Sequence, residues 1–198
     1  MIKTFILAVI IRLSLFTGGC AQNSSSGSEE KSSERDAVNT LQFGTKYSVK
    51  GEVNDLRDLV AGLLGENYWP DTLFSGEELS ERTGISEEMY DSFLAEYQHT
   101  GAGIDRMILI EAKEDQIENI ENYLNEYRDV LLQIYEQQPQ NKAKVFASRI
   151  ETIDRYVCFV QLGADLSALK EKGEDEMIRH CQEENERALD IIEKNVLK

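Results

Sequence analysis

The 198-residue sequence predicts an α+β domain. We expect a four-stranded antiparallel sheet with two long helices on one face, in the order ββαββα, preceded by short N-terminal helices. Two observations predict this class. Apolar residues recur at helical spacing in two long stretches, and a pair of short apolar runs precedes each of them. The hydrophobic content of 41% is too high for a disordered chain and is enough for one core.

The first 19 residues have the composition of an export signal peptide. Lys3 provides a basic start, an apolar run extends from residue 5 to residue 11, and small residues lead up to Cys20. A helix that crosses a bilayer needs ~20 mostly apolar residues, whereas Arg12 interrupts this run early. We therefore expect an export signal and no permanent membrane span at this end.

The residues Gly18-Gly19-Cys20 resemble the lipobox of bacterial lipoproteins. This resemblance implies cleavage before Cys20 and a lipid on its sulfur, with long acyl chains such as palmitate. Buried acyl chains contribute ~0.8 kcal/mol per CH₂, so two chains hold a protein stably on a membrane. The predicted location is the extracytoplasmic face of the cell membrane. The alternative is an ordinary secretory signal with an unmodified cysteine.

Residues 20–50 are predicted to be a lipidated, flexible tether. The stretch 21–36 contains six serines and almost no apolar side chain. No burial of apolar surface would offset the entropy lost on ordering it. The folded α+β domain is accordingly assigned to residues 51–198.

The first part of the domain is predicted to be helical. Apolar residues at helical spacing predict a helix from Gly51 to about Gly65, and its apolar face comprises Leu56, Leu59, Val60, Leu63 and Leu64. Ser75 and Glu78 have the spacing of a capping box for a short helix that ends at Gly84. Ser86 is expected to open a further helical segment, whose buried side comprises Met89, Tyr90, Phe93 and Leu94.

The rest of the domain shows the strand-strand-helix order twice. The first unit has strands at 96–99 and 106–112 around a Gly-rich turn, and a helix over 114–137 that Pro139 ends. The second has strands at 147–153 and 156–162 around Asp154-Arg155, and a helix over 174–195. The run Ile104–Ile110 is similar to Ile153–Phe159, which either reflects a duplicated ββα unit or arose by chance.

The charge of the chain disfavours one class of partner. Lys and Arg number 21 against 37 Asp and Glu, for a net charge of −16. A surface this acidic repels phosphate backbones, so we expect no nucleic-acid binding.

The sequence contains no motif for a cofactor, a metal or a catalytic nucleophile. His99, His180, Cys158 and Cys181 lie on separate elements without the usual zinc spacing, so no metal is predicted. We therefore expect no enzyme activity and no cofactor. Cys158 and Cys181 leave two alternatives open, namely a disulfide bond or two buried free thiols.

A recognition surface is the remaining candidate site. Tyr68, Trp69, Tyr97 and His99 lie in or near predicted loops. Aromatic side chains in loops often contact ligands or protein partners.

The whole arrangement resembles a family of small lipoproteins from Gram-positive bacteria that carry a domain of unknown function. The resemblance rests on the lipobox-like start, the Ser-rich segment, Arg128, Tyr135 and Pro139 near the end of a long helix, and the hairpin at Asp154-Arg155-Tyr156-Val157. It implies no catalytic or ligand-binding residues. We expect a membrane-anchored, non-catalytic binding module with an envelope or membrane protein partner. The alternative is an extracytoplasmic protein that binds a small molecule or an ion.

Overall fold

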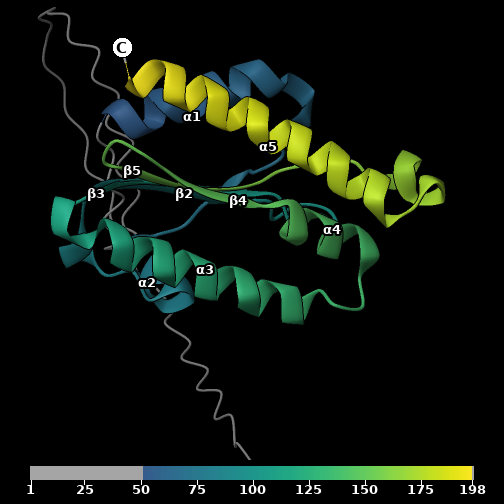
Figure 1. Cartoon of the computed structure of the whole chain (residues 1–198), viewed down its shortest axis with the longest axis horizontal. Coiled ribbons are helices and arrows are strands. Elements are labelled where there is room, and N and C mark those ends of the chain that lie inside the picture. The colour runs from purple at the N-terminus through teal and green to yellow at the C-terminus, as the bar shows by residue number, and fades with distance from the viewer. Residues whose placement is uncertain (1–50, 198) are drawn as a thin grey trace, which may run out of the picture. The chain divides into compact units, whose positions relative to one another are not determined.

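The structure is a computed structural model that describes residues 51–197 (Figure 1). The predicted signal peptide, Cys20 and the predicted tether lie outside these residues. The strands are β1 (Thr72–Leu73), β2 (Tyr90–Tyr97), β3 (Arg106–Ala112), β4 (Arg149–Ile153) and β5 (Tyr156–Gln161). The helices are α1 (Gly51–Leu64), α2 (Gly76–Thr83), α3 (Ile117–Ile134), α4 (Pro139–Ala147) and α5 (Glu174–Val196). Among the described residues, no helix has the length and hydrophobicity needed to cross a bilayer.

The α+β class is confirmed, but the sheet has five strands instead of the four predicted. The strand order is β1-β2-β3-β5-β4, and each neighbouring pair is antiparallel. The additional strand, β1, pairs only Thr72 and Leu73 with the end of β2. Two residues are too few to show an alternating pattern, so the sequence carries no sign of this edge strand.

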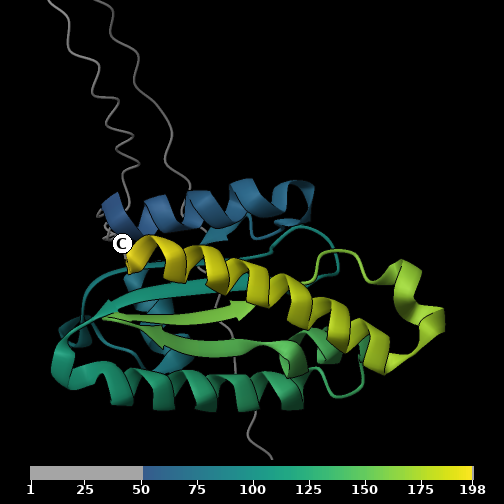
Figure 2. The same cartoon turned by 45° about the horizontal axis from the view of Figure 1, so that its top comes forward.

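The prediction that both long helices cover one face of the sheet is wrong. The helices α3 and α5 lie on opposite faces, with α2 beside α3 and α1 beside α5 (Figures 1 and 2). Neighbouring residues of β3 confirm this, because Ile108 packs in the core on the α3 side and Leu109 in the core on the α5 side. The runs Met107–Ile110 and Val157–Val160 are apolar at every position, which is typical of strands buried on both faces.

The opposite placement of the helices also argues against a symmetric duplication. The strand order β2-β3-β5-β4 is compatible with a two-fold axis perpendicular to the sheet, between β3 and β5. That axis would keep α3 and α5 on the same face, whereas the structure separates them. The two similar sequence runs also differ in burial, since Asp105 is buried and Asp154 is exposed.

Local signals in the first half of the domain are partly confirmed. Ser75 and Glu78 form the predicted capping box, with hydrogen bonds of 3.1 Å and 2.9 Å, and Gly84 ends α2 at a φ of +83°. Leu59 and Leu63 were predicted to face inward, but they are 40% and 42% exposed. The packed face of α1 is narrower, and its buried residues are Val53, Leu56, Val60 and Leu64.

Two further elements differ from the prediction. The helical turn predicted after Ser86 is present as a 3₁₀ helix over Glu87–Met89, but the segment from Tyr90 to Leu94 is part of β2 instead of a helix. Both faces of β2 are buried, and this makes apolar residues fall at helix-like spacing. The preceding helix, α3, ends at Ile134, so Pro139 does not end it but is instead the first residue of α4. Proline is favoured at this position, where its missing N–H has no intrahelical partner in any case.

A buried ion pair connects four parts of the chain. The carboxylate of Asp105, just before β3, accepts a hydrogen bond from the ammonium of Lys144 on α4, and both side chains are at most 3% exposed. The second oxygen of Asp105 accepts from the backbone N–H groups of Gly163 and Ala164 at 3.2 Å and 2.9 Å. Lys144 also donates to the Ala164 carbonyl, at 2.6 Å, and lies 5.3 Å from the centre of the Trp69 ring.

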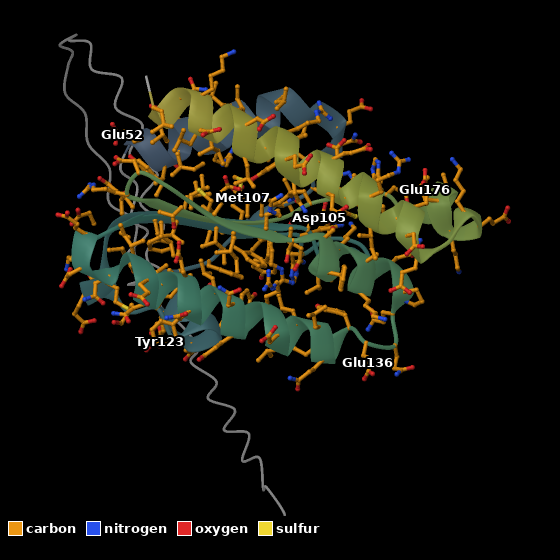
Figure 3. All side chains as sticks on the ribbon, viewed as in Figure 1. Glu52, Asp105, Met107, Tyr123, Glu136 and Glu176 are labelled. Atoms are coloured by element: carbon orange, nitrogen blue, oxygen red, sulfur yellow. The ribbon has the colours of Figure 1, made fainter. Side chains whose placement is uncertain are left out.

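Burial and hydrogen bonding shift the pKa of Asp105 in opposite directions. Burial raises the pKa of the Asp105 carboxyl, whereas Lys144 and the two backbone N–H groups lower it. Asp105 lies in the interior, between the sheet and the helices (Figure 3). The ion pair therefore joins the start of β3, α4 and the loop after β5, under the Trp69 ring.

We predict that Lys144→Met lowers the free energy of unfolding by about 3–5 kcal/mol, because it leaves a buried carboxylate without its cation. In Asp105→Asn/Lys144→Met the loss is expected to be smaller than the sum of the two single losses. Urea unfolding of the four proteins measures both effects. Two single variants within 1 kcal/mol of the parent would contradict this role of the pair.

Candidate functional site

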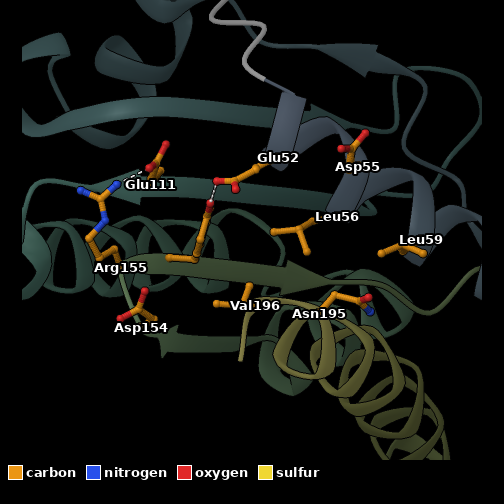
Figure 4. Close-up of a pocket in the computed structure, with 10 residues that line it drawn as sticks. Glu52, Asp55, Leu56, Leu59, Glu111, Asp154, Arg155, Asn195 and Val196 are labelled. Carbon is orange, nitrogen blue, oxygen red and sulfur yellow. Dashed lines mark hydrogen bonds and ion pairs between the residues drawn. The ribbon is translucent and has the colours of Figure 1, made fainter. Parts of the chain in front are cut away.

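A cavity of about 410 Å³ opens beside the first turns of α1 (Figure 4). It lies between α1, the turn that joins β4 to β5, and the last residues of α5. Its lining residues are Glu52, Asp55, Leu56, Leu59, Glu111, Asp154, Arg155, Tyr156, Asn195 and Val196. We call this space the acidic cavity.

The polar residues of the acidic cavity come from four elements, α1, β3, β5 and α5, and from the turn between β4 and β5. Glu52, near the start of α1, accepts a hydrogen bond of 2.5 Å from the hydroxyl of Tyr156 on β5. Arg155, in the hairpin turn, forms an ion pair with Glu111 on β3 and another, of 3.1 Å, with Asp91. These contacts fix the rim of the cavity on the side of the sheet.

The charge of the acidic cavity is strongly unbalanced. Four carboxylates line it against a single guanidinium, that of Arg155. Burial and the hydrogen bond to Glu52 raise the pKa of Tyr156 above its usual range, so the hydroxyl stays protonated and keeps donating. Leu56, Leu59 and Val196 add an apolar part. Such a lining suits a cationic group that carries an apolar portion.

The predicted recognition surface is divided between the two faces of the sheet. Tyr68 packs on the α1/α5 core and donates a hydrogen bond of 2.6 Å to Glu96. Tyr97 lies on the α3 side, where it stacks on Phe74 at 4.8 Å and contacts the His99 ring at 6.0 Å. The structure therefore brings Tyr97 and His99 together and places Tyr68 elsewhere.

Trp69, the fourth residue of that surface, covers the buried ion pair. Its indole N–H donates to the Glu66 carbonyl at 2.9 Å, and its ring lies against Lys144. Trp69 therefore packs the loop that follows α1 against the helix α4.

Asp71 joins the two loops near these aromatic residues. Its carboxylate accepts from the backbone N–H of His99 at 2.7 Å, and from both the backbone N–H and the hydroxyl of Thr100. The hydrogen bonds from Thr100 and His99 hold the pKa of Asp71 well below its usual range. The loop before β1 is thereby fastened to the β2–β3 loop.

The two thiols of the domain lie in different clusters. Cys158 faces the α1/α5 core, whereas Cys181 packs with residues of α4 and lies close to Gly163. Both are free and buried, and burial raises the pKa of each thiol to about 12. Over residues 51–197, no group of three or more His, Cys, Asp or Glu side chains is placed to hold a metal ion.

No pattern in the sequence points to the acidic cavity. Glu52 and Tyr156 are 104 positions apart, and Asn195 and Val196 come from the far end of the chain. Each of the four acids is ordinary at its own position, for example at the start of a helix or in a turn. The packing of α1 on the sheet brings these acids to one place, and α5 adds Asn195 and Val196.

Comparison with known proteins identifies one family match. Residues 65–162 match the family described as Domain of unknown function (DUF4358), so this segment carries a domain of unknown function. The matched segment runs from the end of α1 through β5, and it includes Glu111 and Tyr156 but neither Glu52 nor α5. No curated protein and no solved structure matches the chain.

We predict that neither Cys158 nor Cys181 reacts with a thiol reagent at pH 8 while the chain is folded. With a pKa of about 12, the thiolate fraction at this pH is roughly one in ten thousand. The Cys20→Ala variant is used so that only these two thiols are present. Labelling is measured by mass spectrometry before and after unfolding in guanidinium. Labelling of both thiols only after unfolding is expected. Rapid labelling of the folded chain, or a mass showing a disulfide, would contradict the prediction.

We also predict that Asp71 makes stability depend on acid pH. Its pKa is lower in the folded chain than its ordinary value of 3.8. Its contribution is therefore present above pH ~4 and is lost as the pH falls below that value. Asp71→Asn should be less stable than the parent at pH 7, and the difference should shrink towards pH 2. Urea midpoints at several pH values measure this, with Glu136→Gln as an exposed acid for comparison. A constant difference across the range would refute the prediction.

Proposed function

We propose that this chain is an exported lipoprotein, anchored through Cys20 at the extracytoplasmic face of the cell membrane. Support comes from the basic start, the short apolar run and the residues Gly18-Gly19-Cys20. The Ser-rich residues 21–36 fit a linker between an anchor and a folded domain. The resemblance to Gram-positive lipoproteins with a domain of unknown function agrees with this proposal.

The domain, in this proposal, acts as a non-catalytic binding module for an envelope or membrane protein. The observation that carries it is the acidic cavity, an open hollow with four carboxylates and one guanidinium in a chain of net charge −16. Charge of this sign attracts Lys and Arg side chains and speeds their encounter with the surface. The partner is therefore expected to present a basic, partly apolar segment.

The anchor is tested with Cys20→Ala. The parent chain is expected in the membrane fraction, and it should incorporate radiolabelled palmitate. The variant should lose both properties. Membrane association and labelling that persist in Cys20→Ala would refute the lipid anchor at this residue.

The binding role is tested by cross-linking in cells and mass spectrometry. An affinity tag belongs in the Ser-rich segment, because Val196 lines the cavity and a C-terminal tag would lie beside it. Asp55→Asn/Asp154→Asn removes two charges at exposed positions, and Asp154 has a φ of +53° that asparagine also tolerates. Glu118→Gln/Glu136→Gln removes two exposed charges associated with α3, on the opposite side of the sheet.

We predict that the cavity variant loses a basic envelope partner at least tenfold, while the α3 variant retains it. Equal capture by the two variants would place the interaction outside the cavity. If the parent captures no specific protein, the binding role itself is refuted, whatever the result for the anchor.

A small-molecule ligand is the second candidate function, and the size of the acidic cavity favours it. Ligand pockets commonly measure ~300–1,000 Å³, and this one has about 410 Å³. A cationic ligand with an apolar part should raise the melting temperature of the parent and leave Asp55→Asn/Asp154→Asn unchanged. A library of organic amines that shifts neither protein would count against this candidate.

A further inference from the structure

A second hollow adjoins the acidic cavity on the same surface. It has a volume of about 370 Å³ and is lined by Leu63, Arg187, Asp190, Ile191 and Lys194. Leu63 follows Leu59 of the acidic cavity by one turn of α1, and Lys194 directly precedes Asn195 of that cavity on α5. The two hollows therefore continue each other along the line where α1 and α5 lie side by side (Figure 2). We call them together the α1–α5 groove.

The charge of the α1–α5 groove changes sign along its length. The acidic cavity has four carboxylates and one guanidinium, whereas the second hollow has Arg187 and Lys194 against the single carboxylate of Asp190. Arg187 is held at this end by an ion pair of 2.9 Å with Glu184 and a hydrogen bond of 3.4 Å to the Leu63 carbonyl. A segment that lies along the whole groove therefore meets negative charge at one end and positive charge at the other.

The middle of the groove presents apolar side chains. Leu59 and Leu63 on α1 are 40% and 42% exposed, so a partner can contact both of them. Ile191 and Val196, from α5, are partly buried and line the opposite wall. Apolar side chains between charged ends complement an amphipathic helix, which carries one apolar face and polar residues elsewhere.

Gly62 leaves the surface of α1 low beside these two leucines. Glycine in a helix interior is less favourable than any other residue except proline. Gly62 lies within α1 and has no positive φ, and no described atom is within 4 Å of a Cβ built at this position. The described fold therefore does not require a glycine here, whereas the close approach of another backbone does favour one.

We propose that the α1–α5 groove binds an amphipathic helix of an envelope or membrane protein. The basic end of that helix lies in the acidic cavity, its acidic end lies beside Arg187 and Lys194, and its apolar face packs on Leu59 and Leu63. The lining extends from Glu52 to Leu63 on α1, which is about 16 Å at a rise of about 1.5 Å per residue. A helix of about three turns has this length. This inference rests on the proposed binding function and specifies the form and charge pattern of the partner.

Photo-cross-linking from two positions of the full-length chain in cells tests the proposal. A photo-reactive amino acid replaces Leu59 in one variant and Leu63 in another, and mass spectrometry locates the labelled residues. We expect both positions to label one segment of the same protein. The residue labelled from position 59 should lie nearer to a Lys or Arg, and the residue labelled from position 63 nearer to an Asp or Glu.

The other outcomes separate this inference from the proposed function. Adducts from position 59 without adducts from position 63 would overturn the helix in the groove and leave the binding role of the acidic cavity intact. Adducts from the two positions on different proteins, or only on a second copy of this chain, would also overturn it. No specific adduct from either position would overturn both claims.

A bulky residue at Gly62 provides an independent test. Gly62→Phe fills the surface between the two leucines and should reduce cross-linking from position 59 at least tenfold. Val130→Phe adds an aromatic ring at an exposed position of α3 and should leave cross-linking unchanged. The melting temperature of Gly62→Phe is expected to be no lower than that of the parent, because its side chain meets no described atom at the Cβ. Unchanged cross-linking in Gly62→Phe would overturn the proposal.

A charge reversal tests the basic end of the groove without adding bulk. Lys194→Glu should weaken cross-linking from position 63 at least fivefold, because it places a carboxylate beside the acidic end of the partner. Lys172→Glu makes the same charge change at an exposed position outside the groove and should have no effect. Equal cross-linking in these two variants would overturn the assigned polarity of the partner.

Discussion

The buried ion pair between Asp105 and Lys144 is the constraint that fixes the end of the sheet where β3 begins and β5 ends. Asp105 directly precedes the central strand β3, and Lys144 is on α4, which packs against α5. Two buried charges persist only when both are paired and fully hydrogen-bonded. Here the carboxylate receives a lysine and two backbone N–H groups. The loop after β5 must therefore follow one path, and that path leads into α5.

The position of α5 in turn creates the candidate site. Because α5 runs back along α1 on the same face of the sheet, its last residues meet the first turn of α1. The hairpin turn between β4 and β5 closes the third side. Four carboxylates from α1, β3 and the hairpin turn lie around one arginine in this space, and the end of α5 completes its wall.

Local features of the fold could be predicted from the sequence, and long-range ones could not. The cap of α2 depends on Ser75 and Glu78, which are three residues apart, and the β4–β5 hairpin depends on two turn residues. Both sides of β3 and β5 are apolar, so both faces of the sheet need a helical cover. The sequence prediction instead placed the two long helices on one face. No sequence pattern connects the residues of the acidic cavity, because Glu52 and Tyr156 come into contact only in the folded chain. Of the predicted aromatic residues, Tyr97 and His99 lie together, while Trp69 covers the ion pair.

We propose above all that the acidic cavity is the binding surface of the domain. A photo-reactive amino acid at Leu59, which lines the cavity, tests it most directly in living cells. The same amino acid at Val130, on α3 and 51% exposed, is the matched position on the opposite side of the sheet. We predict adducts to a basic partner at position 59, and none to a specific protein at position 130. A specific partner captured from position 130 and not from position 59 would contradict the account.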